Sequence, residues 1–308
     1  MSGDAPQRHF GDRLAAAVAG RESQIVLGLD PDPARLWPEG QAAGEKASGG
    51  VAQRAAEAVV AHCEAAIEAV AEACVAAKLQ LACFERLGAP GWRALERVSS
   101  CAQANGLLVI ADAKRGDIDV SAAAYAQAFV GATPTPWGEV NGLAADAVTI
   151  SPYLGPDTLE PFVAAARERG RGMFVLVRTS NPGGAFLQDA ELAEGDRVWE
   201  RMAGVVTDLG AEGSEISDVG AVTGATVPEH LERLRELMPT APFLLPGIGA
   251  QGGSVADVAP AFTPGRAGGL VTSSRGIVGA HEKAGGEPAA AARAEAERLR
   301  EQAWALSA

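Results

Sequence analysis

The most informative stretch of the chain reads Leu107-Leu108-Val109-Ile110-Ala111-Asp112-Ala113-Lys114-Arg115-Gly116-Asp117-Ile118. Its first five residues form an apolar run, which is typical of a strand buried on both faces. Because side chains alternate along a strand, Asp112 and Lys114 are expected on the same side. Charges at the end of a buried strand need partners. Such a pair can hold a lysine charged and direct its proton. By itself, Asp-x-Lys is equally compatible with a salt bridge that only ends a strand.

On both sides of this stretch, predicted strands alternate with predicted helices, and this pattern indicates a parallel sheet with crossover helices. The strands are predicted at residues 25–29, 75–81, 107–111, 147–150, 173–177, 219–222, 243–245 and 269–272. The helices are predicted at residues 10–18, 51–71, 92–104, 119–129, 156–169, 198–209, 228–238 and 287–306.

Eight strands of this kind favour a (β/α)8 TIM barrel, which we expect to form a single domain over residues 1–308. A lead-in helix would precede the first strand, and a helix would follow the last. An open doubly wound sheet is the alternative. It is disfavoured because no Gly-x-Gly-x-x-Gly motif follows the first strand.

Two segments do not fit the alternation. Residues 41–50 are rich in Gly, Ala, Ser and charge, and we expect a surface excursion there. Residues 133–138 contain two prolines and a glycine, which predicts an irregular insert within residues 131–142. Neither segment has an assignable role.

Composition excludes several classes of partner. The net charge of −13 argues against nucleic acid, although a few local cations could still bind a phosphorylated small molecule. The first nine residues are polar, and no apolar run could span a bilayer, so we expect a cytoplasmic protein with no membrane partner. The four cysteines have neither zinc-site spacing nor accompanying histidines, and we expect buried, reduced thiols at Cys63, Cys74, Cys83 and Cys101.

Polar residues lie in or directly after the predicted strands. In a parallel barrel these positions meet at one rim, where active sites occur. Lys78 is the most telling, because a lysine inside an apolar strand is rarely buried without a partner. Asp112 on the next strand could be that partner, and a snorkelling edge lysine is the alternative. The residues at this predicted rim are Asp30, Lys78, Asp112, Lys114, Ser180, Gln251 and Arg275.

Glycine-rich segments follow the seventh and eighth predicted strands, the usual place of a phosphate site in such a barrel. Backbone N–H groups near Gly252 could cradle an anion, and Arg275 offers a bidentate donor. Two flexible loops and a surface arginine are the alternative. Together, the two segments favour phosphate binding.

The motif Asp112-x-Lys114-x-x-Asp117, followed by Ala124-Tyr125-Ala126, resembles the signature of the orotidine 5'-phosphate decarboxylase family, in its longer bacterial subgroup. The resemblance runs from Phe10 to about Ile277. It implies decarboxylation of orotidine 5'-monophosphate to uridine 5'-monophosphate in pyrimidine biosynthesis, with neither cofactor nor metal. It also implies a homodimer with shared active sites.

The resemblance assigns roles to individual residues. Lys78, Asp112, Lys114 and Asp117 would form the catalytic array, with Lys114 as the proton donor and Asp117 reaching the neighbouring subunit's site. The substrate-binding residues would be Asp30 at the ribose, Ser121 after the array, Ser180 at the pyrimidine edge, and Gln251, Gly252 and Arg275 at the phosphate. Ser274 departs from the family pattern, where glycine is common, and this could alter the backbone contact to phosphate.

Three other functions share part of this pattern. A magnesium-dependent sugar-phosphate decarboxylase or aldolase of the same superfamily would place an acid at position 78, where a lysine would repel the ion. A Schiff-base aldolase would use Lys114 as a nucleophile, but the acids beside it favour its charged form. A non-catalytic phosphate binder would need Arg275 and the glycines, but it gives no reason for the intact array.

Overall fold

The computed structural model describes residues 9–211, 215–224, 228–248 and 255–307. Eight parallel strands close into a barrel in the order β1-β10-β9-β8-β7-β6-β3-β2, which confirms the predicted (β/α)8 architecture. That residues 1–308 form one domain stays a prediction. The barrel strands are β1 (Ile25–Leu29), β2 (Ala76–Gln80), β3 (Leu108–Arg115), β6 (Ala147–Ile150), β7 (Gly172–Arg178), β8 (Val219–Thr223), β9 (Phe243–Leu245) and β10 (Gly269–Ser273).

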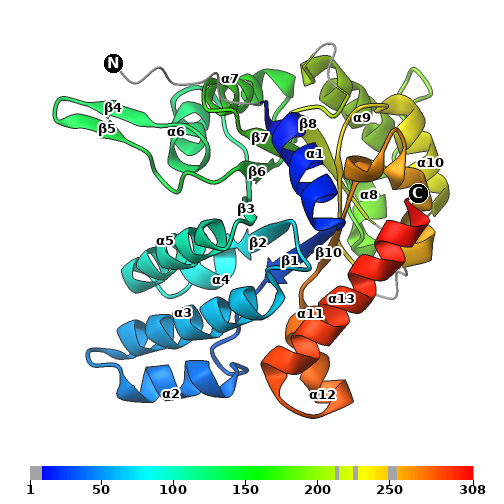
Figure 1. Ribbon diagram of the computed structural model, residues 1–308. Helices are drawn as coiled ribbons and strands as arrows, with labels where there is room; N and C mark the ends of the chain where they lie inside the picture. The colour runs from blue at the N-terminus through cyan, green and yellow to red at the C-terminus, as the bar shows by residue number, and fades with distance from the viewer. Residues whose placement is uncertain (1–8, 212–214, 225–227, 249–254, 308) are drawn as a thin grey trace, which may run out of the picture.

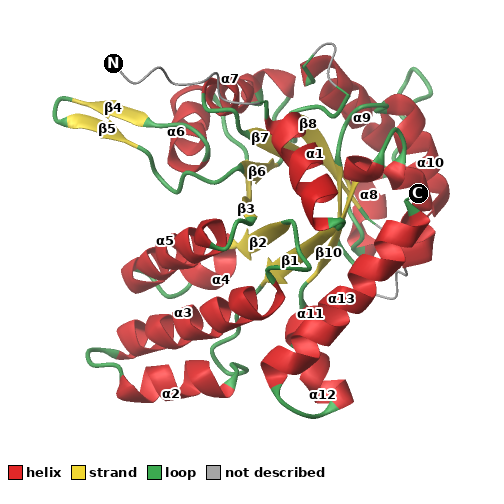
Figure 2. Cartoon of the chain, viewed as in Figure 1, coloured by secondary structure: helices red, strands yellow, loops and turns green. Residues whose placement is uncertain are grey.

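Helices surround these strands (Figure 2). The α-helices are α1 (Phe10–Arg21), α2 (Pro38–Lys46), α3 (Val51–Val70), α4 (Leu81–Glu85), α5 (Ala89–Ala104), α6 (Asp119–Phe129), α7 (Glu160–Glu168), α8 (Ala185–Gln188), α9 (Val198–Leu209), α10 (Pro228–Leu237), α11 (Arg275–Val278), α12 (Ala280–Ala284) and α13 (Pro288–Leu306). The 3-10 turns are η1 (Pro156–Thr158), η2 (Pro182–Gly184), η3 (Val255–Phe262) and η4 (Arg266–Gly268).

The predicted lead-in helix, α1, crosses in front of the barrel strands in Figure 1. It buries Phe10, Leu14 and Val18 against the residues that fill the barrel. Phe10 meets Phe174 of β7 edge to face, with ring centroids 6.2 Å apart. Helix α1 therefore covers one end of the barrel, and the opposite end carries the segments that follow the strands.

Strand alternation divides the apolar residues into two cores. Val26, Ala76 and Ile110 point into the barrel and pack with α1. Their chain neighbours, such as Leu27 and Val109, point outward into the core shared with the surrounding helices. Continuing the period of two along β2 and β3 directs Lys78 and Asp112 into the barrel.

The expected surface excursion at residues 41–50 contains the end of a helix, because α2 runs to Lys46. Pro38 at the helix start, Glu39 in the first turn and Lys46 in the last turn all favour a helix at this place. The preceding residue, Trp37, is buried and donates its backbone N–H to His62 Nδ1 of α3 at 3.1 Å. Packing against α3 therefore orders this part of the surface segment as a helix.

The expected irregular insert at residues 133–138 is also wrong, because it forms a β-hairpin of β4 (Thr133–Thr135) and β5 (Gly138–Val140). The hairpin projects away from the barrel (Figure 2). Trp137 at its tip is 92% exposed. Pro134 is accommodated because an isolated two-stranded ribbon leaves one side of each strand without ladder hydrogen bonds.

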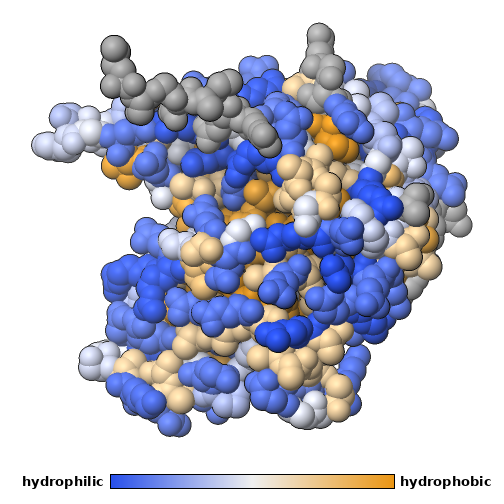
Figure 3. All heavy atoms as spheres, viewed as in Figure 1, coloured by the Kyte–Doolittle hydropathy of each residue, from blue (hydrophilic) through white to orange (hydrophobic). Residues whose placement is uncertain are grey.

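The surface agrees with the acidic composition. Most of the face in Figure 3 is hydrophilic, and strongly apolar residues show only in small patches. None of the described helices has the length and hydropathy that a membrane crossing requires.

All four cysteines are free thiols, as predicted, but only Cys63 and Cys74 are fully buried, whereas Cys83 and Cys101 are half-buried.

Arg235 of α10 is a buried arginine that no carboxylate contacts among the described residues. It donates to the carbonyls of Met238, Ala241, Ala261 and Gly268 at 2.8–3.0 Å. Its guanidinium also lies over the ring of Phe243, 3.8 Å from the centroid. Burial lowers the pKa of Arg235 to about 9. The side chain thus ties α10 to β9 and to the segment before β10.

We predict that Arg235→Met lowers the free energy of unfolding by about 3–5 kcal/mol, because several buried carbonyls lose their donor together. The matched control is Arg233→Met on the same helix, which removes only surface pairs with Glu200 and Glu236. Urea unfolding of the three proteins measures the effect. Equal stability of the two variants would contradict this account of Arg235.

Candidate active site

Lys78 and Asp112 form a buried ion pair inside the barrel. Strands β2 and β3 are parallel neighbours, with Gln80 opposite Asp112 in the register. Lys78 Nζ donates to Asp112 Oδ2 at 2.6 Å, and both residues are 7% exposed. The sequence-predicted partnership between these two residues is therefore present, and the alternative of a snorkelling edge lysine is wrong.

Two more charges extend this pair. Lys114 Nζ donates to Asp112 Oδ1, and the Lys114 side chain is 42% exposed. Asp30 Oδ1, directly after β1, lies 3.7 Å from Lys78 Nζ and is 41% exposed. The result is a chain of alternating charge, Asp30–Lys78–Asp112–Lys114, which is buried in its middle and open at both ends.

The ion pairs fix the charge of the buried members. Burial alone would raise the pKa of Asp112, but the ammonium groups of Lys78 and Lys114 outweigh it and lower this pKa to about 2. Burial alone would lower the pKa of Lys78, but Asp112 and Asp30 outweigh it and raise this pKa. Asp112 therefore stabilises the fold above its unfolded pKa of about 4 and loses this contribution as the pH falls through about 2. Lys78 loses its contribution only in strong alkali.

Two residues that the sequence analysis did not identify complete the hydrogen bonds of Asp112. Thr149 Oγ1, on β6, donates to Asp112 Oδ1 at 2.9 Å. With its amide oriented to satisfy both ends, Gln80 Nε2 donates to Asp112 Oδ2 at 2.9 Å. Each carboxylate oxygen thus accepts two hydrogen bonds. The alternation that directs Lys78 and Asp112 inward also directs Gln80 and Thr149 inward, and this signal could have found them.

The backbone around Lys114 is unusual. Lys114 has φ of 46°, in the left-handed region that non-glycine residues rarely adopt. The β3–β6 register shifts between Ala111 and Arg115, and Lys114 N donates to Thr149 Oγ1 at 3.0 Å. At Gly116, a Cβ atom would lie 2.6 Å from the Ser151 carbonyl oxygen. Gly116 is therefore needed for close approach to the chain after β6.

Asp117 does not join the array within this chain. It is half-buried, and among the described residues it forms no ion pair. Its Oδ1 accepts the N–H of Ile118 at 2.8 Å. Ile118 is the N-cap of α6 and makes no side-chain cap bond of its own, so Asp117 satisfies the first backbone N–H at this helix end. Ser121 lies exposed in the first turn of the same helix.

A cavity of about 860 Å³ opens between the end of β1 and the segments after β10. Asp30, Ser274 and Arg275 line it, whereas Lys78, Asp112 and Lys114 do not. A Cβ at Gly28 would lie 1.9 Å from Ser274 Oγ, so this glycine allows Ser274 to pack against β1. Arg275 is exposed, and no described residue forms an ion pair or hydrogen bond with its guanidinium. The cavity is therefore lined both by the cationic side chain of Arg275 and by Asp30, the first residue of the array.

The remaining predicted residues are only partly placed. Ser180 is half-buried and follows β7, close to Gly224 at the end of β8. This is the rim at which the array lies. The predicted phosphate residues Gln251 and Gly252 lie outside the described residues.

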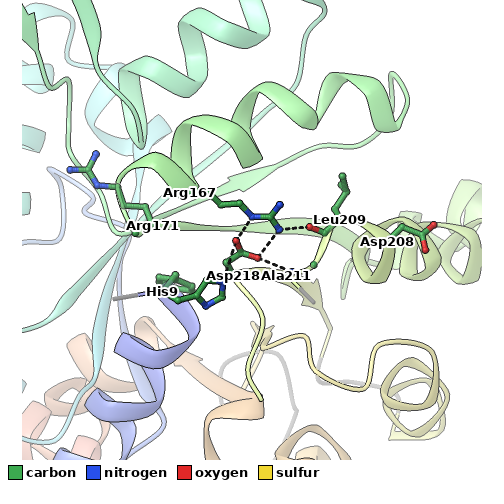
Figure 4. A pocket seen from close by; sticks show the side chains of 10 residues that line it. His9, Arg167, Arg171, Asp208, Leu209, Ala211 and Asp218 are labelled. Carbon is green, nitrogen blue, oxygen red and sulfur yellow. Dashed lines mark hydrogen bonds and ion pairs between the residues drawn. The ribbon is translucent and has the colours of Figure 1, made fainter. Parts of the chain in front are cut away.

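A second cavity, of about 640 Å³, lies at the opposite end of the barrel, where α1 begins and where β7 and β8 start (Figure 4). Arg167 Nε donates to Asp218 Oδ2 at 2.6 Å, and His9 Nε2 lies 3.4 Å from the same oxygen. Arg167 and Asp218 therefore pair with each other at this cavity. None of the sequence-predicted residues lines this cavity, so the candidate site is the other rim.

Comparison with known proteins identifies the family of the chain. Residues 23–294 match the model of the Orotidine 5'-phosphate decarboxylase / HUMPS family. Orotidine 5'-phosphate decarboxylase from Rhodopirellula baltica is 43% identical over 281 residues, which cover 89% of each chain. The enzyme of that name from Haloarcula marismortui is 44% identical over 278 residues, 90% of this chain and 89% of that one.

Solved structures show the same relationship. The crystal structure of a putative orotidine 5'-phosphate decarboxylase from Streptomyces avermitilis superposes with a TM-score of 0.80 at 33% identity. The match covers 100% of this chain and 98% of that one. The family match spans the whole barrel, from β1 to α13, and includes every residue of the charged array. The chain therefore belongs to the Orotidine 5'-phosphate decarboxylase / HUMPS family.

Proposed function

We propose that this enzyme, a carboxy-lyase, converts orotidine 5'-monophosphate to uridine 5'-monophosphate in pyrimidine biosynthesis, without metal or cofactor, and that Lys114 supplies the proton. The observation that carries the proposal is the alternating array, in which Asp112 bonds the buried ammonium of Lys78 on one oxygen and, on the other, the ammonium of Lys114 at the open end. A buried ion pair in a strand needs no such open end if it serves the fold alone.

The chemistry follows from the charges. When the bond between C6 and the carboxylate breaks, carbon dioxide leaves and the electron pair stays on C6. A fixed ammonium group stabilises that developing negative charge, as preorganised donors do at other reaction centres. Lys114 then transfers a proton to C6, and the neutral amine regains a proton from water. Asp112 keeps the ammonium oriented between turnovers.

The array also weighs against the other functions. Both oxygens of Asp112 already accept hydrogen bonds from ammonium groups, and Lys78 lies where a metal-dependent relative would need an acid. A Schiff-base aldolase would need a neutral amine at Lys114, beside a carboxylate that favours the charged form. A simple phosphate binder would gain nothing from burying Lys78 and Asp112.

The substrate would lie across the rim. Arg275 would bind its phosphate, with Gln251 and Gly252, and Asp30 would bind the ribose at the Lys78 end of the array. Ser180 would read the pyrimidine edge, and Ser121 would act beside the array. The cavity of about 860 Å³ that holds Asp30 and Arg275 supports the phosphate and ribose assignments. Binding energy from the distant phosphate would organise the reacting end.

The proposal includes a homodimer in the cytoplasm, with Asp117 serving the partner's site. Asp117 has a carboxylate without a cation in its own chain, among the described residues. Large apolar side chains on the segments after β3, β6 and β7 are exposed, among them Val120 (83%), Tyr153 (77%) and Phe186 (92%). Exposed apolar groups gathered around one rim are typical of a protein interface. A two-fold axis there would bring two such rims together.

We predict that purified protein decarboxylates orotidine 5'-monophosphate and keeps its activity after exhaustive chelation, since Lys78 would repel a metal ion at Asp112. The loss of substrate absorbance measures turnover, and elemental analysis measures bound metal. Stoichiometric magnesium together with activity that chelation abolishes would overturn the cofactor-free proposal. No turnover in either sample would overturn the reaction itself.

We predict that Arg275→Ala weakens binding of uridine 5'-monophosphate by at least about tenfold, because each lost charge-assisted bond is worth roughly 1.5–3 kcal/mol. Added phosphite should restore part of the turnover of a substrate that lacks its phosphate. Arg35→Ala is the control, since Arg35 lines the same cavity but is paired with Glu282 at 2.7 Å. Equal affinity of the Arg275 variant and the parent would contradict the phosphate assignment.

We predict that inactive Lys114→Ala and Asp117→Ala chains regain activity when they form a mixed dimer. One site then carries both substitutions, and the other has an intact Lys114 and an intact Asp117. Up to half of the sites in the mixed dimer should be active. Co-expression with two different tags isolates this dimer for assay, and a dimer of two differently tagged Lys114→Ala chains is the control. A folded but inactive mixed dimer would disprove the shared site.

A further inference from the structure

We propose that Thr149 is a positioning residue for Lys114, which it holds through both the Lys114 backbone and Asp112. Thr149 lies on β6 and has no exposed surface. Its hydroxyl accepts a hydrogen bond from Lys114 N at 3.0 Å and donates one to Asp112 Oδ1 at 2.9 Å. The same carboxylate oxygen accepts the bond from Lys114 Nζ. The inference rests on the proposed role of Lys114 as the proton donor.

These contacts close a ring. It runs from the Lys114 backbone N–H to the Thr149 hydroxyl, then to Asp112 Oδ1, and returns through the Lys114 side chain. The direction of the hydroxyl is fixed, because a backbone N–H can only donate and an ionised carboxylate can only accept. The hydroxyl proton of Thr149 is therefore donated to Asp112, and the hydroxyl oxygen accepts the Lys114 backbone N–H.

The ring matters because Lys114 has an unfavourable backbone conformation. With φ of 46°, this residue needs surrounding contacts to hold its shape. Thr149 is the side chain that bonds the Lys114 N–H, at the bulge where β3 and β6 change register. Without the Thr149 hydroxyl, the Lys114 backbone N–H would lose its acceptor and Asp112 would lose one of its four hydrogen-bond donors. The ammonium would then have more orientations than the productive one.

Thr149 does not itself meet the substrate, since it is fully buried beneath Asp112. Its removal should therefore affect the chemical step and leave product binding intact. The residues proposed to bind ribose and phosphate, Asp30 and Arg275, follow β1 and β10, whereas Thr149 lies on β6. The expected result is a lower kcat with an unchanged affinity for uridine 5'-monophosphate. General loosening of the barrel would instead lower both kcat and this affinity.

The test compares Thr149→Val, which keeps the shape but removes the hydroxyl, with Thr149→Ser, which keeps the hydroxyl. Thr272→Val is the control, because Thr272 is a buried threonine of β10 whose hydroxyl has no partner among the described residues. For each protein, the measurements are kcat, KM, the dissociation constant of uridine 5'-monophosphate, and the thermal midpoint. If Thr149→Val does not fold, Thr149→Ala replaces it, since alanine and serine here differ only by the hydroxyl.

We expect Thr149→Val to lower kcat by about 10- to 100-fold, as small displacements of a reacting group do. Its affinity for uridine 5'-monophosphate should stay near that of the parent, Thr149→Ser should recover most of the activity, and Thr272→Val should behave like the parent.

Parental kcat in Thr149→Val, or a Thr149→Ser protein as slow as Thr149→Val, would overturn the inference while leaving the proposed function intact, provided that Lys114→Ala is inactive. An equal loss of kcat and product affinity would also overturn it, because that outcome indicates a structural role. Parental turnover in Lys114→Ala would overturn the proposed role of Lys114 and this inference with it.

Discussion

The buried contact between Lys78 and Asp112 constrains the rest of this barrel. Two opposite charges with 7% exposure each can lie inside a barrel only when they face each other and their remaining hydrogen-bonding capacity is satisfied. This requirement fixes the β2–β3 register and directs Gln80 and Thr149 toward the same carboxylate. It also explains why Lys114 can project into the open rim, since its counter-charge is already rigidly held. The exposed Lys114 end of the array is therefore organised by the buried pair in its middle.

The sequence predicted the barrel well because period-two alternation and helical spacing are local properties. The same alternation identified Lys78 and Asp112, since a charge in an apolar strand is conspicuous. Thr149 and Gln80 were missed because threonine is an ordinary strand residue and glutamine at a strand end is an ordinary polar residue. The left-handed backbone of Lys114 could not be predicted, because the contacts that hold it come from another strand. Helix α2 and the β4–β5 hairpin were missed for a similar reason, since composition does not report packing against α3 or ribbon pairing.

The two ends of the barrel use charge differently. At the end covered by α1, Asp218 is bonded by Arg167, and Asp146 is bonded by Arg13. At the other rim, Arg275, Asp117 and the outward side of Lys114 keep hydrogen-bonding capacity that the described part of the chain does not use. Water can solvate these groups because they are exposed or half-buried, so the fold does not require protein partners for them. A charged substrate and a second subunit would use this capacity, which is the pattern expected when stability and function occupy opposite ends of such a barrel.

Fixing Lys114, the proposed proton donor, requires control of two separate features, the direction of its ammonium group and the position of its main chain. A lysine side chain has enough rotatable bonds that a single ion pair leaves many arrangements open. Asp112 constrains the ammonium, and the Thr149 hydroxyl constrains the main chain while bonding the same carboxylate oxygen. Because the two constraints share one atom, a shift of the β3–β6 contact would move both together. The bulge between these strands is thus a part of the site, although it lies beneath the surface that a substrate would touch.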